Sequence, residues 1–224
     1  MIVGKQKDFD IIWDMVKGYK KVLVFGCNTC VAVCHEGGNK EAEILASLLR
    51  MKATQETCDI EITDGGIERQ CEHDFFDSVA EKVNRADAVL SIACGAGVQF
   101  TAEKFPHKII IPGLNTTFIG VVDAPGVFTE RCAMCGDCIL DKTGGLCPIT
   151  RCSKSLQNGP CGGSNKGYCE ISNEIVCIWD QIVRKMMDQG RIDDLVEIKK
   201  PKNWRCSWSG GPRKMIREGI ADNE

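Results

Sequence analysis

The segment from Cys132 to Cys177 constrains the fold more than any other part of the chain, because it holds eight of the fifteen cysteines. It contains no apolar run long enough to form a core of its own, so something other than side-chain packing must order it. Metal–thiolate bonds can supply that folding free energy, and eight thiolates complete two four-thiolate sites. The sequence therefore predicts a module built around metal. Its cysteines are Cys132, Cys135, Cys138, Cys147, Cys152, Cys161, Cys169 and Cys177.

The spacing at the start of this segment favours iron over zinc. Cys132, Cys135 and Cys138 follow a C-x2-C-x2-C pattern, and a Cys-Pro pair follows at Cys147. This is the bacterial ferredoxin run with a longer last gap, and the cysteine of its Cys-Pro pair ligates the other cluster. Structural zinc sites more often use cysteine pairs, frequently with histidine. No histidine lies in the segment, although zinc stays open for the irregularly spaced later cysteines.

The ferredoxin order also predicts how the eight cysteines divide between two [4Fe–4S] clusters. Cys177 lies in a predicted amphipathic helix over residues 173–189, capped by Asn173 and ended by Gly190. If Cys177 were not a ligand, Cys169 or Cys206 would have to replace it. The predicted ligands are Cys132, Cys135, Cys138 and Cys177 for one cluster, and Cys147, Cys152, Cys161 and Cys169 for the other.

The first half of the chain alternates short apolar runs with amphipathic stretches, which predicts βαβ units and a parallel sheet. We expect an α/β fold with a small open sheet of about four strands, of Rossmann or flavodoxin-like type. The predicted helices cover residues 8–20, 39–52 (with Asn39 as N-cap) and 75–84, and the predicted strands cover 21–26, 59–63, 87–93 and 107–111. The predicted domains are 1–125 (α/β), 126–190 (cysteine-rich module and packing helix) and 191–224 (irregular tail).

A third cluster site is predicted at the carboxyl ends of these strands, where open α/β sheets bind ligands. Cys27, Cys30 and Cys34 directly follow the first strand, and Cys94 directly follows the third. Cys27, Cys30 and Cys34 are close in the sequence, and the fold would bring Cys94 next to them, so the four could hold a [4Fe–4S] cluster. Cys71, after the second strand, is the rival fourth ligand, although it and Cys58 could also be ordinary free thiols.

Composition narrows the possible settings and partners. No secretory signal is visible in the first residues, so we expect the fifteen cysteines to be thiolate ligands in a reducing cytoplasm rather than disulfides. No run approaches the length of a membrane span, and a net charge of −3 without a basic block disfavours nucleic acid. The full G-x-G-x-x-G pattern is absent, and no acid–base or nucleophilic constellation is visible, so we predict no catalytic residues.

The last stretch has no core pattern. Tryptophan and arginine often anchor interfaces, so Trp204, Trp208 and Arg213 are predicted partner contacts. The alternatives are a tail that folds back over the clusters and a disordered terminus.

Two motifs give the chain a specific resemblance. The run CAMCGDCILDKTGGLCPITRCSKSLQNGPCGG, with the later GYCEI and SGGPRK, resembles the methylenetetrahydrofolate reductase C-terminal family. The earlier GCNTCVAVCHEGG is similar to the first cysteine motif of the small iron–sulfur subunit in that family, formerly described as a zinc finger.

The resemblance implies a non-catalytic subunit of an oxidoreductase complex. Its implied partner is the flavin-bearing catalytic subunit, which carries FMN and reduces 5,10-methylene-tetrahydrofolate to 5-methyl-tetrahydrofolate in the one-carbon branch of the reductive acetyl-CoA pathway. This chain would relay single electrons through two or three [4Fe–4S] clusters, with zinc possible at one site and further electron-transfer subunits upstream. A structural metal scaffold and a ferredoxin-like adaptor of another flavin reductase are the alternatives.

Overall fold

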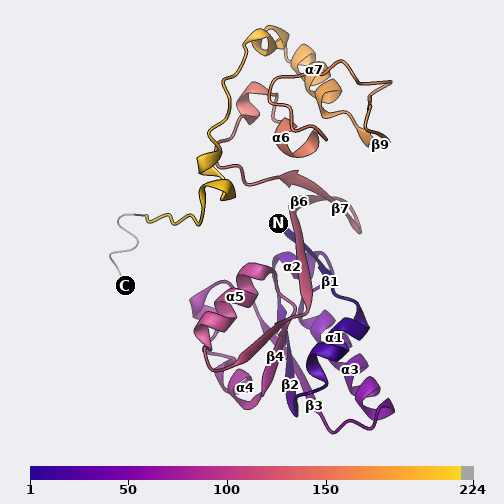
Figure 1. Ribbon diagram of the computed structural model, residues 1–224, viewed down its shortest axis with the longest axis vertical. Helices are drawn as coiled ribbons and strands as arrows, with labels where there is room; N and C mark the ends of the chain where they lie inside the picture. Colours follow the sequence, from indigo (N-terminus) through magenta and orange to yellow (C-terminus); the bar gives the residue numbers. More distant parts are fainter. Residues whose placement is uncertain (218–224) are drawn as a thin grey trace. The chain divides into compact units, whose positions relative to one another are not determined.

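The chain folds into two compact units, Met1–Thr129 and Glu130–Glu224, in a computed structural model that describes residues 1–217 (Figure 1). The boundary falls inside strand β7 (Val127–Cys132). The predicted division placed it after residue 125 and separated a tail at 191. Residues 191–217 cluster instead with the cysteine-rich segment in the second unit.

A four-stranded parallel sheet forms the centre of the first unit, which confirms the predicted α/β class. Its strands are β2 (Lys21–Cys27), β3 (Glu61–Ile67), β4 (Ala88–Ser91) and β5 (Ile109–Pro112). They lie in the order β3-β2-β4-β5, and all neighbours run parallel. Strand β2 is buried from Val22 onward, as expected for a central strand covered on both faces.

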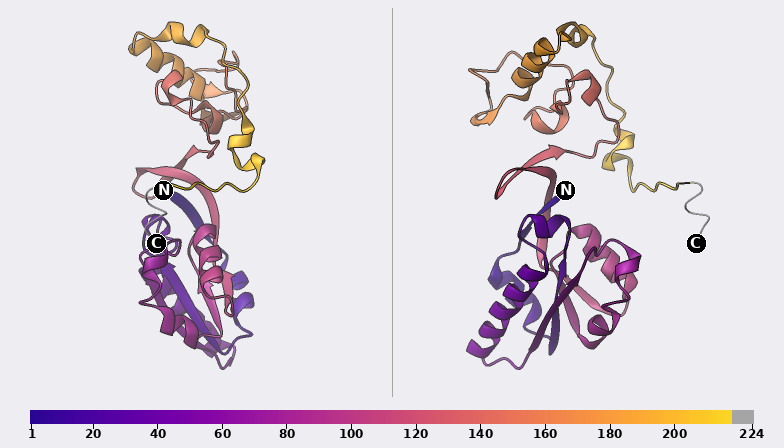
Figure 2. Two further views of the ribbon diagram at one scale, coloured as in Figure 1. Left: turned by 90° about the vertical axis from the view of Figure 1, so that its left-hand side faces the viewer. Right: turned by 180° about the vertical axis from the view of Figure 1, so that it is seen from behind.

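Helices cover both faces of this sheet, as Figure 2 shows. Helices α1 (Phe9–Val16) and α3 (Asn39–Gln55) bury Ile12, Leu45 and Leu49 against Val22, Val24 and Leu90 on one face. On the other face, α4 (Ala80–Arg85) and α5 (Gly95–Lys104) contribute Val83 and Phe100 to a cluster around Leu23 and Phe25. The sheet therefore has two apolar cores and needs no metal to bury them.

Three expectations for the first unit were wrong in detail. Asn39 is the first residue of α3, and Gly38 is the N-cap, with its N–H donating to the Glu41 carboxylate at 2.9 Å. Residues 75–84 divide between the 3-10 turn His73–Phe75 and α4. Helix α5 was missed, because its opening GAG has weak helix propensity and only tertiary packing stabilises it.

A small antiparallel sheet also escaped prediction. It contains β1 (Ile2–Gln6), β6 (Leu114–Ala124) and β7, in the order β1-β6-β7. Strand β1 begins before the first predicted helix, and its five residues give too short an alternation to be recognised in the sequence.

The second unit contains little regular structure. Its elements are α6 (Pro148–Arg151), the hairpin of β8 (Tyr168–Cys169) and β9 (Ser172–Val176), α7 (Ile178–Asp188), and the 3-10 turns η2 (Leu140–Lys142), η3 (Ile192–Val196), η4 (Trp204–Cys206) and η5 (Trp208–Gly210). Its core cluster consists of Ile178, Trp179, Ile182 and Met186, all from α7. The predicted packing helix therefore exists and supplies this core.

The predicted start of that helix was wrong. Residues 172–176 pair with β8 as a strand, so Asn173 is no N-cap and Ile175 lies on β9. Cys177 is the N-cap of α7, and its N–H donates to the Gly167 carbonyl at 2.8 Å. Hairpin pairing overrode the helical periodicity here. Across residues 1–217, no helix combines the length and apolar character needed to cross a membrane.

Candidate metal centres

The first cysteine group lies at the carboxyl edge of the parallel sheet. Cys27 ends β2, Cys30 begins the four-residue helix α2 (Cys30–Val33), and Cys34 is the C-cap of that helix. Cys94 follows β4 and is the N-cap of α5. Cys27 and Cys34 are buried in one apolar cluster, and Cys94 packs against that cluster. The fold thus brings Cys94 close to Cys27 and Cys34, although it lies about 60 residues later in the chain.

The position of this group follows from the strand order. Across the sheet the strands lie in the order β3-β2-β4-β5. The chain passes from β2 to β3 on one side and then to β4 and β5 on the other side, so the strand order reverses between β2 and β4. Ligands of open α/β sheets bind at such a switch point, outside the carboxyl ends of the strands. Cys27 and Cys94 follow these two strands, so both lie at the switch point.

Cys71 also lies close to this group, although its side chain is exposed. Partial burial raises the pKa of the Cys71 thiol, and the charges of Cys27, Cys94 and Cys30 raise it further. Burial likewise raises the pKa of the Cys34 thiol, with contributions from Glu36 and Cys30. Five cysteines therefore meet at this edge, and Cys71 and Cys94 both remain candidates for the fourth ligand.

A buried polar network joins the three segments that carry these cysteines. Gln70 is fully buried, and its amide donates to the carbonyls of Phe25 and Gly26 at 3.0 Å each. Its carbonyl accepts from the hydroxyls of Ser91 at 2.7 Å and Thr101 at 3.2 Å. Gln70 thus ties the segment before Cys71 to the ends of β2 and β4. Sequence reasoning missed it, since a lone glutamine in a loop gives no signal.

In the second unit, four cysteines line one cavity of about 230 Å³. The first three come from the C-x2-C-x2-C loop, and Ile139, Leu140 and Ile149 add apolar surface. The fourth cysteine is the N-cap of α6. The four are Cys132, Cys135, Cys138 and Cys147.

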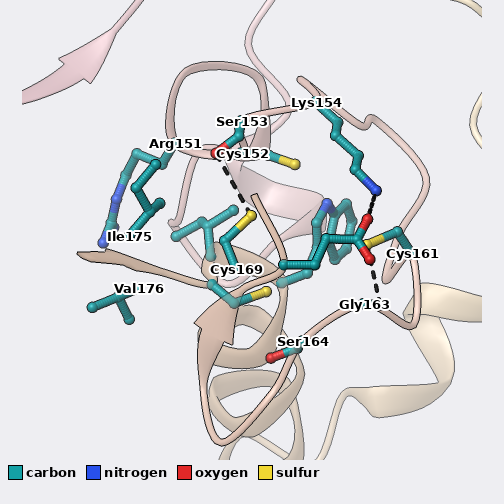
Figure 3. A pocket seen from close by; sticks show the side chains of 14 residues that line it. Arg151, Cys152, Ser153, Lys154, Cys161, Gly163, Ser164, Cys169, Ile175 and Val176 are labelled. Carbon is teal, nitrogen blue, oxygen red and sulfur yellow. Dashed lines mark hydrogen bonds and ion pairs between the residues drawn. The ribbon is translucent and has the colours of Figure 1, made fainter. Parts of the chain in front are cut away.

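The other four cysteines line a second, tighter pocket of about 20 Å³ (Figure 3). One lies at the end of α6, one in the loop that follows, one on β8, and one at the start of α7. Arg151 and Lys154 also line this pocket, and Lys154 forms an ion pair with Glu170. The four are Cys152, Cys161, Cys169 and Cys177.

The pockets therefore group the cysteines differently from the ferredoxin order, exchanging Cys147 and Cys177. The reason is local structure. Helix α6 has Cys147 at one end and Cys152 at the other, so one cysteine faces each pocket. The β8–β9 hairpin carries Cys177 back towards Cys169. Arg151 fixes α6 to α7 by donating to the Gln181 side-chain oxygen at 2.8 Å.

The immediate surroundings of the sulfurs suit thiolate ligands. The backbone N–H of Met134 donates to Cys132 Sγ, and that of Gly163 donates to Cys161 Sγ, each at 3.4 Å. A backbone hydrogen bond at Ile171, with help from the Ser153 hydroxyl, lowers the pKa of the Cys169 thiol. Hydrogen bonds to the charged form favour thiolate over thiol, and metals of the iron–sulfur and zinc type select soft thiolate donors. The residues present therefore fit a thiolate-bound metal.

The cysteines are not drawn together around a single point. All of them are free, and within residues 1–217 no group of three or more His, Cys, Asp or Glu side chains is arranged to hold one metal ion. What the structure supplies is two shared pockets and one shared sheet edge.

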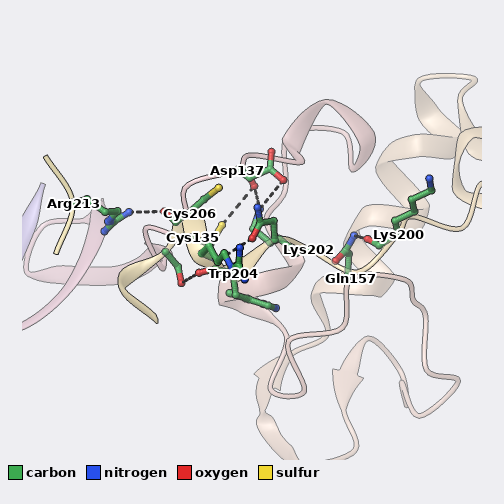
Figure 4. A network of polar contacts seen from close by, with 11 residues as sticks. Cys135, Asp137, Gln157, Lys200, Lys202, Trp204, Cys206 and Arg213 are labelled. Carbon is green, nitrogen blue, oxygen red and sulfur yellow. Dashed lines mark hydrogen bonds and ion pairs between the residues drawn. The ribbon is translucent and has the colours of Figure 1, made fainter. Parts of the chain in front are cut away.

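The tail residues differ in their surroundings. Trp204 and Trp208 are exposed, 46% and 76% respectively, whereas Arg213 donates to the carbonyls of Cys206 at 3.0 Å and Met134 at 3.3 Å within its own unit (Figure 4). The segment therefore folds back on the first cysteine loop, which was one of the expected alternatives. Cys206 lies against Gly136, whose positive φ of 80° and missing Cβ allow that approach.

These features define a class: an α/β unit with a cysteine group at its sheet edge, followed by a cysteine-rich unit with two four-cysteine pockets. Residues 111–205 match the family described as methylene-tetrahydrofolate reductase C terminal, which confirms the resemblance over that segment and links the chain to methylenetetrahydrofolate reductase. The match covers both pockets and fewer than half of the residues. No curated protein and no solved structure matches the chain.

Proposed function

We propose that this chain is the iron–sulfur electron-transfer subunit of a methylenetetrahydrofolate reductase complex. The observation that carries the proposal is the pair of four-cysteine pockets inside the family-matched segment. Eight thiols sorted into two sets of four, without histidine, have the stoichiometry of two [4Fe–4S] sites. Such sets of four thiolates are the ligands that electron-transfer clusters use.

The proposed ligand sets follow the pockets. The first cluster takes Cys132, Cys135, Cys138 and Cys147; the second takes Cys152, Cys161, Cys169 and Cys177. The third takes Cys27, Cys30 and Cys34 at the sheet edge, with Cys94 or Cys71 as fourth ligand. We further propose that this sheet represents the first four strands of a flavodoxin-like arrangement, because its order is second, first, third, fourth.

When bound, such clusters accept and release single electrons. The residues of this chain hold the thiolates in place, donate N–H groups to Cys132 and Cys161, and exclude water with Ile149, Ile178 and Trp179. Both N–H contacts favour the charged state of the sulfurs. In the complex, electrons pass between this chain and the FMN of the catalytic partner, where methylene-tetrahydrofolate is reduced. The exposed Trp204 and Trp208 are candidate contacts with that partner.

A direct test is electron delivery to the flavin. The chain is reduced with dithionite, freed of excess reductant, and mixed anaerobically with the oxidised flavin-bearing reductase. We expect bleaching of the flavin absorbance in step with cluster reoxidation, and loss of that transfer in Cys135→Ala. If the two proteins bind each other and the reduced clusters leave the flavin oxidised, the relay is wrong.

A second candidate, a structural metal scaffold, has one observation in its favour. The second pocket encloses only about 20 Å³, and the unit around it has the side chains of one short helix as its core. A single zinc ion bound by four thiolates would order such a unit without redox activity. Stoichiometric zinc with no redox signal in the oxygen-free protein would support this function over the relay.

A further inference from the structure

We infer that residues 199–213 form a strap that closes over the first four-cysteine site, and that Lys202 is the built-in countercation of that site. The inference rests on the proposed function, because it assigns a cationic partner to a cluster bound by Cys132, Cys135, Cys138 and Cys147.

One end of the strap is docked near the second pocket. The Asn158 side chain accepts from the Lys199 N–H and donates to the Lys199 carbonyl, both at 2.9 Å. Gln157 donates to the Lys200 carbonyl at 2.7 Å. Residues 157 and 158 lie between Cys152 and Cys161, so three hydrogen bonds join this end of the strap to the loop of the second site.

The other end lies on the first site, as Figure 4 shows. Cys206 contacts Gly136, between Cys135 and Cys138, so closely that a Cβ on Gly136 would lie 2.0 Å from the Cys206 carbonyl oxygen. Arg213 donates to the carbonyls of Met134 and Cys206. Ser207 is 1% exposed, and its hydroxyl donates to the Trp204 carbonyl at 2.6 Å, which stabilises the turn at this end.

Lys202 lies between these anchors and is the feature that gives the strap a chemical role. Its side chain is only 1% exposed, which is rare for lysine and costs free energy unless the ammonium is paired. The ammonium donates to the Asp137 carbonyl and lies 3.4 Å from the Asp137 carboxylate. The Cys135 sulfur lies 3.7 Å from that same carbonyl oxygen. A buried positive charge is therefore fixed beside a ligand of the first site.

The position of this charge sets its expected effect. A cluster bound by four thiolates is anionic, and reduction adds one electron and thus one more negative charge. A nearby ammonium stabilises the reduced state more than the oxidised state, because the Coulomb attraction grows with the negative charge. Lys202 is thus expected to raise the reduction potential of the first cluster, and Asp137 to lower it.

The test is an EPR-monitored redox titration of the full chain prepared without oxygen. We expect Lys202→Met to shift the midpoint potential of one cluster to more negative values, and Asp137→Asn to shift the potential of the same cluster to more positive values. Lys202→Arg keeps the positive charge and should therefore keep the wild-type potential. Lys200→Met is the matched control, because it removes a lysine charge from the same strap at an exposed position and should shift nothing.

Closure of the strap has its own readout. Trypsin should cleave the wild-type chain slowly after Arg205, and faster in Lys202→Met, because loss of the contacts between the Lys202 ammonium and Asp137 releases the strap. Cleavage after Lys185 in helix α7 is measured in the same digest, because loss of metal would speed both cuts whereas release of the strap speeds only the cut after Arg205.

The outcomes separate the two proposals. Iron clusters whose potentials are the same in wild type, Lys202→Met and Asp137→Asn would overturn the countercation and leave the electron relay intact. A wild-type chain that holds no redox-active iron would overturn the proposed function and the countercation with it. Cleavage after Arg205 that is equally fast in wild type and Lys202→Met would overturn the closed strap.

Discussion

At the scale of single residues, the surroundings of each cysteine predict when its thiol ionises in the metal-free chain. A backbone hydrogen bond at Ile171 lowers the pKa of Cys169, whereas burial and the neighbouring thiolates raise the pKa of Cys71. A thiol reacts with alkylating agents as thiolate, so its reaction begins as the pH rises towards its pKa. We expect iodoacetamide to modify Cys169 at a lower pH than Cys71, measured by mass spectrometry after pulses at increasing pH. This order should hold even where metal removal loosens the second unit, because the first unit keeps Cys71 in the surroundings that raise its pKa. The reverse order would contradict the described surroundings.

The exchange of Cys147 and Cys177 is also tested at single residues. Each Cys→Ala change should disturb one cluster, so two changes in the same set remove one cluster and changes in different sets remove two. The pair Cys135→Ala with Cys147→Ala is therefore expected to lose about 4 irons per chain, and Cys161→Ala with Cys147→Ala about 8. The pocket-based ligand sets would be contradicted if the two double variants lost equal amounts of iron, or if Cys135→Ala with Cys147→Ala lost more iron than Cys161→Ala with Cys147→Ala.

Gln70 lies in a loop, but we expect its side chain to contribute to the stability of the first unit. Gln70→Leu removes one hydrogen-bond partner from each of four groups, namely the Phe25 and Gly26 carbonyls and the Ser91 and Thr101 hydroxyls, although Phe25 keeps the Ile92 N–H and Thr101 keeps the Gly97 carbonyl. We expect a loss of about 1–3 kcal/mol in the free energy of unfolding, together with weaker metal retention by the Cys27–Cys94 group. Gln99→Leu is the matched control, because Gln99 is exposed, and its effect should stay within about 0.5 kcal/mol.

At the scale of elements, helix α7 carries the core of the second unit. Ile182 is fully buried there with Trp179 and Met186, and the Trp179 indole donates to the Leu156 carbonyl at 3.1 Å. Ile182→Ala should lower the free energy of unfolding of the second unit by about 2–5 kcal/mol. Hydrogen exchange would detect this loss as lower amide protection in α7. Met187→Ala, at an exposed position of the same helix, should leave protection unchanged. Loss of protection in α3 as well would show that the two units do not unfold independently.

The helices and strands differ in how well the sequence predicted them. The buried strands β2 and β4 and the long helix α3 were predictable, because their apolar residues recur with the period of a single element. Helix α5 and strand β1 were not, because contacts with residues distant in the sequence stabilise them. The β8–β9 hairpin was not, because β9 lies in a stretch whose apolar residues also have helical spacing. The same limit explains the cysteine sets: ligand spacing identified the eight residues, but the turn of α6 and the hairpin decide which of them share a pocket.

At the scale of the whole molecule, the two units are expected to respond differently to metal removal. The first unit buries two apolar cores around a sheet, whereas the second has one small core of four α7 side chains with a few partly buried leucines packed against it. Metal binding should therefore supply much of the folding free energy of the second unit and little of that of the first. Treatment with a chelator under reducing conditions should make residues 130–217 sensitive to trypsin while α3 keeps its protection from hydrogen exchange. Equal sensitivity of both units would contradict this division.

The proposed electron relay requires iron–sulfur clusters in this chain, so metal and sulfide analysis of the anaerobically purified protein is its decisive test. Iron, acid-labile sulfide and zinc are measured together, and low-temperature EPR spectra are recorded after dithionite reduction. We expect about 12 irons per chain with an equal amount of sulfide, and EPR signals of interacting reduced clusters. Zinc with almost no iron or sulfide in such a preparation would contradict it.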